Sequence, residues 1–234
     1  MSSAVVIGVS GGIGGGLARA LVASGRYATV HGLSRRPIDP IPGVVHGVLD
    51  ITDEPGIAAA ADRVGSTSLV IVATGVLQSE QFTPERTYRA LDMDAMMAVY
   101  LANTVGPALV AKHFLPRLPK GERAIFAALS ARVGSIADNR LGGWHSYRAS
   151  KAALNMLIRN FALELARDRP EAICVGLHPG TVDTALSQPF QRGVRPDKLF
   201  TTDYAAERLL SVLGGLSPAD SGNVFAWDGV IIPP

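Results

Sequence analysis

The sequence predicts a single α/β domain, in which about seven parallel strands form a doubly wound sheet with helices on both faces. Short apolar runs alternate with longer helical patterns along the whole chain. Strand candidates such as "AVVIGV" and "LVIVAT" are continuously apolar, which is typical of parallel strands covered on both faces. The connections are short, and no linker or repeat divides the 234 residues. These three observations favour one doubly wound domain.

Each expected element has its own signal in the chain. The short β-rich runs predict strands at Ala4–Val9, Thr29–Ser34, Val44–Leu49, Leu69–Thr74, Arg123–Leu129, Ala172–Leu177 and Asn223–Trp227. The longer runs between them predict helices at Gly12–Ala23, Pro55–Val64, Leu91–Leu115, Trp144–Arg167 and Thr202–Leu213.

The composition narrows the class of protein. Hydrophobic residues make up 47% and charged residues 18%, which suits a large buried core. A net charge of +2 gives no reason to expect nucleic acid or a membrane surface as a partner. Cys174 is the single cysteine, and no cysteine–histidine cluster has the spacing of a metal site. Without a signal-peptide pattern or an apolar run of roughly 20 residues, we expect a cytoplasmic protein.

A glycine-rich loop joins the first expected strand to the first helix. In "VVIGVSGGIGGGLARAL" the glycines Gly8, Gly12 and Gly14 follow a strand and open a helix. Glycine permits a sharp turn and a close approach to a pyrophosphate, whose charge is stabilised by the helix N-terminus. Glycine-rich turns without a ligand are also common. The placement favours a dinucleotide site in a Rossmann-type fold.

A tyrosine and a lysine lie four residues apart in "HSYRASKAALN". This spacing brings Tyr147 and Lys151 to one face of a helix. Carbonyl reduction needs a proton donor at the nascent alkoxide. A nearby ammonium and an oxidised nicotinamide would lower the pKa of a phenol from its ordinary value of about 10. The alternative is the polar edge of an ordinary amphipathic helix.

These two motifs and three others, in the same order, resemble the short-chain dehydrogenase/reductase family. The others are "LDITD", "LANTVGP" and "HPGTVDT". The texture of "LSARVGSIADNRLGGWHSYRASKAALNML" is closest to the C-factor and Sniffer-type carbonyl reductases. The resemblance implies a dinucleotide-binding half at about 1–120 and a catalytic half at about 121–234.

The resemblance also implies roles for individual residues. The implied catalytic residues are Tyr147 as proton donor, Lys151, Asn103 as the relay asparagine, and Ser130. The implied cofactor-binding residues, besides Tyr147 and Lys151, are Gly8, Ser10, Gly12, Ile13, Gly14, Ser34, Arg35, Arg36, Asp50, Ile51, Ala73, Thr74, Gly75, Pro179, Gly180, Val182 and Thr184.

The chain departs from the family pattern at the catalytic serine. The family motif is S-x-x-G, and in "LSARVGS" the serine position belongs to Ala131. Ser130 is one residue early, so in a regular strand it points to the opposite face. A bulge would restore it. Both outcomes stay open, with Ser130 slightly favoured as the substrate hydrogen-bond donor. A second departure is "VATG", where the family commonly has N-N-A-G.

The choice of cofactor depends on the end of the second expected strand. An acidic residue there binds the ribose of NAD, but this chain has Arg35 and Arg36. Guanidinium groups bind a 2′-phosphate well, so we expect NADP rather than NAD. Two solvated arginines in a turn are the alternative.

The leading functional hypothesis is an NADPH-dependent reductase of aldehydes, ketones or quinones. An NADP-binding signalling or regulatory protein with weak turnover is the alternative, because Ala131 stands at the serine position. We expect the substrate loop at residues 186–200. The helices Leu91–Leu115 and Trp144–Arg167 are expected to form a face through which the chain self-associates to a homodimer or homotetramer. Small residues on the second helix would allow close helix packing there.

Overall fold

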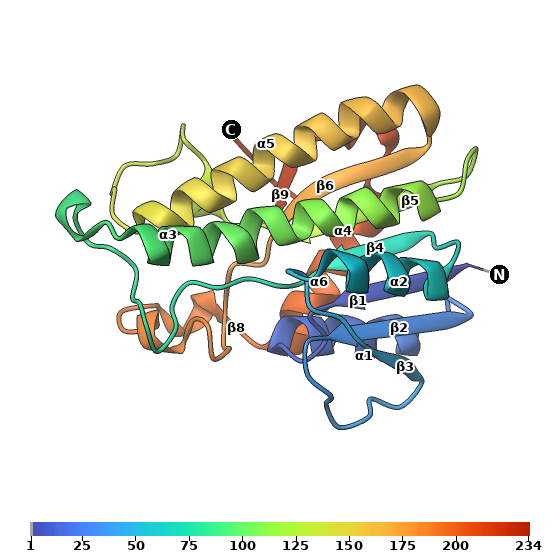
Figure 1. Cartoon of the computed structure of the whole chain (residues 1–234), viewed down its shortest axis with the longest axis horizontal. Helices are drawn as coiled ribbons and strands as arrows, with labels where there is room; N and C mark the ends of the chain where they lie inside the picture. Colours follow the sequence, from blue (N-terminus) through green and yellow to red (C-terminus); the bar gives the residue numbers. More distant parts are fainter. Residues whose placement is uncertain (1) are drawn as a thin grey trace.

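The chain folds around one mostly parallel sheet. A computed structural model describes residues 2–234, and its main sheet has eight strands in the order β10-β9-β6-β5-β4-β1-β2-β3 (Figure 1). Neighbouring strands are parallel, apart from the antiparallel pair β9 and β10. The predicted doubly wound α/β class is confirmed.

The elements alternate along the chain as the apolar pattern predicts. The strands are β1 Ser3–Ile7, β2 Thr29–Ser34, β3 Val44–Val48, β4 Leu69–Val72, β5 Ala124–Leu129, β6 Ala172–His178, β7 Thr181–Val182, β8 Leu199–Phe200, β9 Val224–Ala226 and β10 Ile231–Ile232. The α-helices are α1 Gly12–Ser24, α2 Glu54–Val64, α3 Met93–Tyr100, α4 Gly106–Phe114, α5 His145–Asp168 and α6 Thr202–Gly215. The short strands β7 and β8 pair apart from the main sheet.

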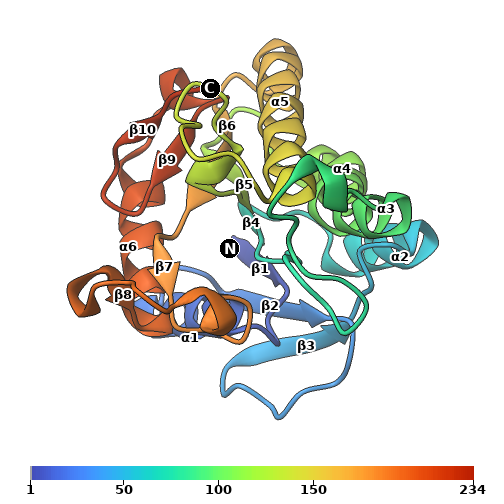
Figure 2. The same cartoon turned by 90° about the vertical axis from the view of Figure 1, so that its left-hand side faces the viewer.

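Two layers of helices cover the sheet. One core joins the sheet residues Val5 and Phe126 to α2, α4 and α5, whereas the other joins Val6 and Ile125 to α1 and α6. Figure 2 shows the two groups of helices on opposite faces of the sheet. Because successive residues of a strand point to opposite faces, both faces need apolar side chains. The continuous apolar runs in the sequence follow from this burial.

The strand order reverses beside β1. The chain builds β1, β2 and β3 outward in one direction, then crosses to β4 on the other side of β1. A crevice forms at such a switch point, outside the carboxyl ends of the strands, and ligands of doubly wound proteins bind there. The glycine loop follows β1 and the segment "ATG" follows β4. Both predicted cofactor segments therefore meet at this edge.

The predicted helix Leu91–Leu115 is divided in the structure. A π-helical turn at Leu101–Val105 separates α3 from α4, and the N–H of Gly106 donates to the carbonyl of Leu101. Pro107 has no N–H for the carbonyl of Asn103, so a regular α-helical bond is missing at this place. The wider turn is the consequence, and π turns of this kind recur at functional sites.

The same run is long and apolar. Met93–Arg117 has the length and the mean hydropathy, 1.2, of a membrane-crossing helix, yet 33% of its most apolar window is buried inside the molecule. Its inner face supplies Val110, Ala111 and Phe114 to the core. Core helices of globular domains meet the same two criteria, so the run is weak evidence for a membrane span.

Candidate active site

The glycine loop forms a turn that has no room for side chains. Gly8 has φ +93, and a Cβ there would lie 2.9 Å from the carbonyl oxygen of Ala73. A Cβ on Gly14 would overlap the carbonyl oxygen of Gly8, and one on Gly12 would lie 2.7 Å from Thr202. The loop thus brings bare backbone to the start of α1, where free N–H groups face the crevice. This cradle fits the pyrophosphate of a dinucleotide.

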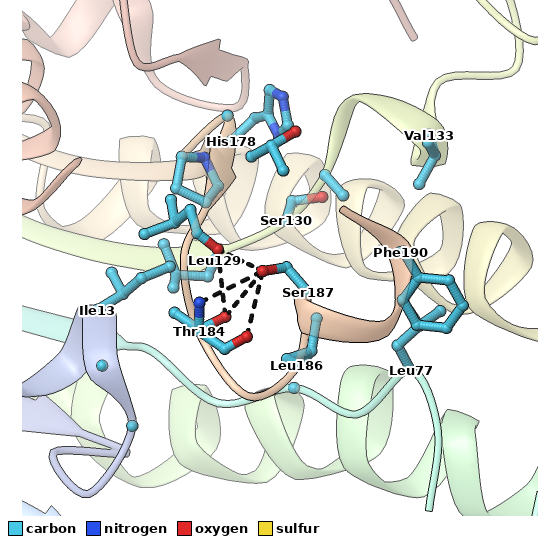
Figure 3. Close-up of a pocket in the computed structure, with 18 of the residues that line it drawn as sticks. Ile13, Leu77, Leu129, Ser130, Val133, His178, Thr184, Leu186, Ser187 and Phe190 are labelled. Atoms are coloured by element: carbon cyan, nitrogen blue, oxygen red, sulfur yellow. Dashed lines mark hydrogen bonds between the residues drawn. The ribbon is translucent and has the colours of Figure 1, made fainter. Parts of the chain in front are cut away.

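A cavity of about 470 Å³ opens between this loop and α5 (Figure 3). Its walls come from the carboxyl ends of β4, β5 and β6, the start of α5 and the loop after β7. The predicted site residues in its lining are Gly12, Ile13, Ala73, Thr74, Gly75, Ser130, Tyr147, Lys151, Pro179, Gly180, Val182 and Thr184. Residues that are distant in the sequence therefore meet at one cavity.

Two predicted cofactor contacts have structural features that suit a bound dinucleotide. The hydroxyl oxygen of Thr74 is buried and has no hydrogen-bond partner among the described residues. Gly75 is exposed, and a Cβ there would be in van der Waals contact with Asn103 Oδ1 at 3.5 Å and with Lys151 Nζ at 3.6 Å. An unpaired buried hydroxyl is costly, and a ribose hydroxyl would satisfy it. The residues present fit the cofactor that the sequence predicts.

Tyr147 and Lys151 project from the first two turns of α5 into this cavity. Lys151 Nζ lies 5.9 Å from the centroid of the Tyr147 ring and donates a 2.7 Å hydrogen bond to the carbonyl of Leu129. The Lys151 side chain is only 2% exposed. Gly134 permits this packing, since a Cβ there would lie 2.8 Å from the Cβ of Lys151. The glycine of the "ARVG" segment is thus needed to seat the lysine.

Burial shifts the pKa values of both groups. It raises the pKa of Tyr147 to about 12 and lowers the pKa of Lys151 to about 8. Loss of water is the cause of the shift at Tyr147, and its direction is opposite to the lowering that a nearby ammonium and an oxidised nicotinamide would produce. A phenol with a raised pKa stays protonated across the physiological range. Tyr147 therefore holds a proton that it can donate.

Asn103 connects the π-helical turn to the cavity wall. Its side-chain oxygen accepts from the N–H of Val76 at 2.8 Å, and its amide donates to the carbonyl of Val76 at 2.8 Å. The amide also donates to Ser150 Oγ at 3.1 Å, next to Lys151 in α5. Asn103 is fully buried. In this structure it braces the loop after β4 against α5.

Ser130 lines the cavity, but its hydroxyl is engaged elsewhere. The β5–β6 register is regular through Leu129, and the Ser130 N–H continues the ladder to Leu177. The hydroxyl of Ser130 donates to the side-chain oxygen of Asn155 at 2.6 Å. Ala131 also lines the cavity, at the end of the strand. The bulge that would redirect Ser130 is not found in the described register.

The remaining predicted cofactor residues are not part of the cavity lining. Gly8 and Gly14 form the glycine turn, and Ser10 is exposed beside it. The N–H of Leu49 donates to the carbonyl of Ser34 where β2 and β3 end. Arg35 and Arg36 follow at the surface. Hydrogen bonds from Thr52 hold the pKa of Asp50 below its usual range, and the charge of Arg35 acts in the same direction. Ile51 packs against Gly106.

Several residues of the cavity were not predicted as site residues. They include Leu77, Val133, Trp144 and His178, whereas Ser187 lies in the expected substrate loop 186–200. Burial lowers the pKa of His178 to about 4, so its ring is neutral near pH 7. Ser187 Oγ accepts and donates within the loop after β7, which Figure 3 shows beside Thr184. For Trp144 and His178 the available signal was their position next to "YRASK" and "PG".

The fold and the cavity define a class of protein. A glycine turn at the switch point, facing a half-buried tyrosine and a buried lysine on one helix, is an arrangement for a dinucleotide-dependent oxidoreductase. Residues 2–194 match the family model described as short chain dehydrogenase. The chain belongs to this family, which confirms the family that the motifs predict.

Three similar proteins agree with this assignment. C-signal of Myxococcus xanthus is 36% identical over 61% of this chain and 81% of its own length. A 1-hydroxy-2-glutathionyl-2-methyl-3-butene dehydrogenase of Rhodococcus sp. (strain AD45) is 29% identical over 99% of both chains. The solved structure of an NADPH-bound carbonyl reductase from chicken fatty liver is 30% identical, with a TM-score of 0.86 over 100% of this chain and 98% of that one. The predicted carbonyl reductase branch is confirmed.

Proposed function

We propose that this oxidoreductase reduces the carbonyl group of an aldehyde, ketone or quinone with NADPH. The observation that carries the proposal is the pair of Tyr147, which is half-buried, and Lys151, which is buried. Both line the same cavity as Gly12 and Thr74 of the cofactor segments. The similarity to an NADPH-bound carbonyl reductase supports it. The test is loss of NADPH absorbance across a panel of carbonyl compounds.

When NADPH is bound, it would supply the hydride for the carbonyl carbon. Tyr147 gives its phenolic proton to the carbonyl oxygen, so that the C=O group becomes CH–OH. The ammonium of Lys151 stabilises the phenolate that forms at Tyr147, and it would also bind the nicotinamide ribose. Asn103 fixes the wall beside Lys151 through its bond to Ser150. The turn at Gly8, Ser10, Gly12, Ile13 and Gly14 holds the pyrophosphate.

The other cofactor contacts follow the path of the dinucleotide. We assign the adenine to Asp50 and Ile51, and the adenosine ribose to Ala73, Thr74 and Gly75. The nicotinamide contacts are Pro179, Gly180, Val182 and Thr184. No group of three or more potential ligands in residues 2–234 could hold a metal ion, and the proposed chemistry uses none. A cytoplasmic location suits an enzyme that uses NADPH.

Arg35 and Arg36, beside Ser34, are proposed to select NADP by binding its 2′-phosphate. Replacing both with Ala should weaken NADPH binding by about 10–100-fold, because hydrogen bonds to charged groups contribute about 1.5–3 kcal/mol. NADH binding should change little. Calorimetry with both cofactors measures the two constants, and Arg63→Ala on the exposed face of α2 is the matched control. Equal losses for NADPH and NADH would show that the arginines do not read the phosphate.

The chain is also proposed to form a homodimer or homotetramer. Met93, Met97, Leu101 and Val105 are 75%, 66%, 43% and 42% exposed. Their spacing of four places them along one stripe of the α3–α4 run. On α5, Met156 and Leu163 are also exposed. A contiguous apolar stripe of this kind is typical of an interface.

Light scattering at micromolar concentration should give two or four times the chain mass of 24.5 kDa. Met97→Glu should shift the mass toward one chain, because a charge would be buried in the interface. Ile136→Glu, at another exposed apolar position, should leave the mass unchanged. A wild-type mass of one chain would contradict the proposal.

A second candidate function is an NADP-binding signalling or regulatory protein with weak turnover. The similarity to C-signal and the alanine at position 131 favour it. The two functions differ in a simple measurement. A regulatory protein would bind NADPH tightly and consume almost none with any carbonyl compound of the panel.

A further inference from the structure

Helix α5 begins without a cap from its own sequence. Its N-cap residue is Trp144, which makes no side-chain capping bond, and the first turn of the helix contains no acidic residue. The first N–H groups of a helix need acceptors when they are buried. Tyr147 lies in this first turn, so whatever satisfies the helix end also fixes the proposed proton donor.

Glu85 supplies the missing acceptor from the loop between β4 and α3. Its carboxylate accepts from the N–H of Ser146 at 3.2 Å and from the hydroxyl of Ser146. Its backbone carbonyl accepts from the N–H of Trp144 at 2.5 Å. Glu85 is 6% exposed and Ser146 is 2% exposed. One buried residue therefore binds the chain on both sides of His145, directly before Tyr147.

These bonds hold Trp144 in an unfavourable backbone conformation. Trp144 has φ 50 and ψ 43 and is the one residue other than glycine with a positive φ in the described chain, residues 2–234. Bulky side chains rarely adopt the left-handed region. Such a conformation persists when the surrounding structure enforces it, and it is frequent at functional sites. Here Glu85 provides the enforcing contacts.

The conformation places the indole ring in the wall of the cavity. The ring centroid of Trp144 lies 6.3 Å from that of Tyr147 at an interplanar angle of 78°, and 5.1 Å from that of Phe190 at 65°. These are edge-to-face pairs, which aromatic rings prefer. The indole thus connects the proposed proton donor to the loop after β7, whose residues Leu186 and Val194 also line the cavity.

The rest of the wall is apolar and nearly uncharged. Leu77 and Val133 also line the cavity. Lys151 is the one charged residue at neutral pH among the described lining residues, and its ammonium is bonded to Leu129. A ring-bearing, uncharged molecule would gain edge-to-face contact with the indole there, whereas a small aliphatic molecule would not.

We propose that Glu85 is a positioning residue, which fixes Trp144 as the wall beside Tyr147 and so gives ring-bearing carbonyl compounds an advantage over aliphatic ones. The inference rests on the proposed reductase function. It assigns the specificity to the contact of Glu85 with Trp144 and Ser146, and none of these three residues is among the assigned cofactor contacts.

The test compares kcat/KM for 4-nitrobenzaldehyde and for propanal with NADPH. Trp144→Leu should lower the ratio of the two by about tenfold, the size of a good aromatic contact. Trp144→Phe should retain most of the ratio, because it keeps a ring. Glu85→Ala should lower the ratio by a similar factor, and Glu85→Gln should lower it less. Glu80 is exposed in the same loop, so Glu80→Ala is the control and should leave the ratio unchanged.

A double variant separates positioning from general loss of structure. If Glu85 acts through Trp144, then Glu85→Ala combined with Trp144→Leu should lower the ratio no further than Trp144→Leu alone. Additive losses would overturn the positioning role. If Glu85→Ala does not fold, Ser146→Ala removes the hydroxyl bond to the Glu85 carboxylate, keeps the N–H bond, and should also lower the ratio. An unchanged ratio in Ser146→Ala would then overturn the inference.

The backbone part of the inference has its own measurement. Trp144→Gly should melt at a higher temperature than Trp144→Leu, because glycine adopts a positive φ without strain. If Trp144→Gly melted at the same temperature as Trp144→Leu or below it, the claim that residue 144 is held in a strained conformation would be contradicted. Calorimetry with 4-nitrobenzyl alcohol measures, without turnover, how tightly wild type and Trp144→Leu bind a ring-bearing ligand. Weaker binding by the variant supports the contact of the ligand with the Trp144 ring, even if no carbonyl compound is reduced. Equal binding overturns this contact.

Discussion

Replacing Tyr147 with Phe should lower the rate of NADPH-dependent carbonyl reduction by about 10²–10⁴-fold, the usual contribution of a positioned general acid. The variant keeps the ring that packs against Trp144 at 6.3 Å and removes the transferable proton. Burial raises the pKa of Tyr147 to about 12, so the wild-type phenol is protonated throughout the range of the assay. The chemical step should therefore be lost while the wall of the cavity remains.

NADPH binding separates this effect from damage to the cofactor site. Calorimetry should give nearly the same dissociation constant for wild type and Tyr147→Phe, because the glycine turn and the arginines are untouched. Tyr88→Phe is the matched control, since Tyr88 is 65% exposed and lies outside the cavity lining. Wild-type turnover in Tyr147→Phe would remove Tyr147 from its assigned role. Loss of NADPH binding in the variant would instead point to a structural role.

Sequence patterns predicted the fold well because burial on both faces of the sheet constrains every strand residue. The ends of β2 were predicted at Thr29 and Ser34, where the structure has them. The two-residue strands β7, β8 and β10 were missed, because a run of two residues carries no periodic signal. The π turn in the predicted helix Leu91–Leu115 was also missed. Gly106 and Pro107 were visible in the sequence, but helical periodicity continues across them.

The candidate site was predictable where its residues form local motifs. Tyr147 and Lys151 are four residues apart, and the glycine turn is contiguous, so both were visible before the structure. Glu85 was not, because 61 residues separate it from Ser146, and only the folded chain brings them together. Trp144 was assigned to a helix start, without a role. A left-handed backbone is unfavourable for tryptophan, so its local sequence does not indicate this conformation. The tertiary contacts with Glu85 impose it.

The sequence left the donor to the substrate carbonyl open between Ser130 and a vacant position at Ala131. The strand geometry now bears on that choice. Ala128 contributes to the core on the α5 face and Leu129 to the core on the opposite face. By alternation, Ser130 returns to the α5 face, where its hydroxyl donates to Asn155 at 2.6 Å. A hydroxyl has one proton, so Ser130 would have to leave Asn155 in order to donate to a substrate.

We therefore expect Ala131→Ser to raise turnover by up to about 10²-fold, the typical contribution of one oxyanion donor. Ala131 lines the cavity, and a serine hydroxyl at this position would add a donor without competing with Asn155. Ser130→Ala should be nearly silent in turnover, and Asn155→Ala should be silent as well if its bond to Ser130 is structural. The opposite pattern, with a 10²-fold loss in Ser130→Ala and no gain in Ala131→Ser, would establish Ser130 as the donor. Because the two variants are adjacent and alter one hydroxyl each, their kcat values assign the donor to one strand face or the other.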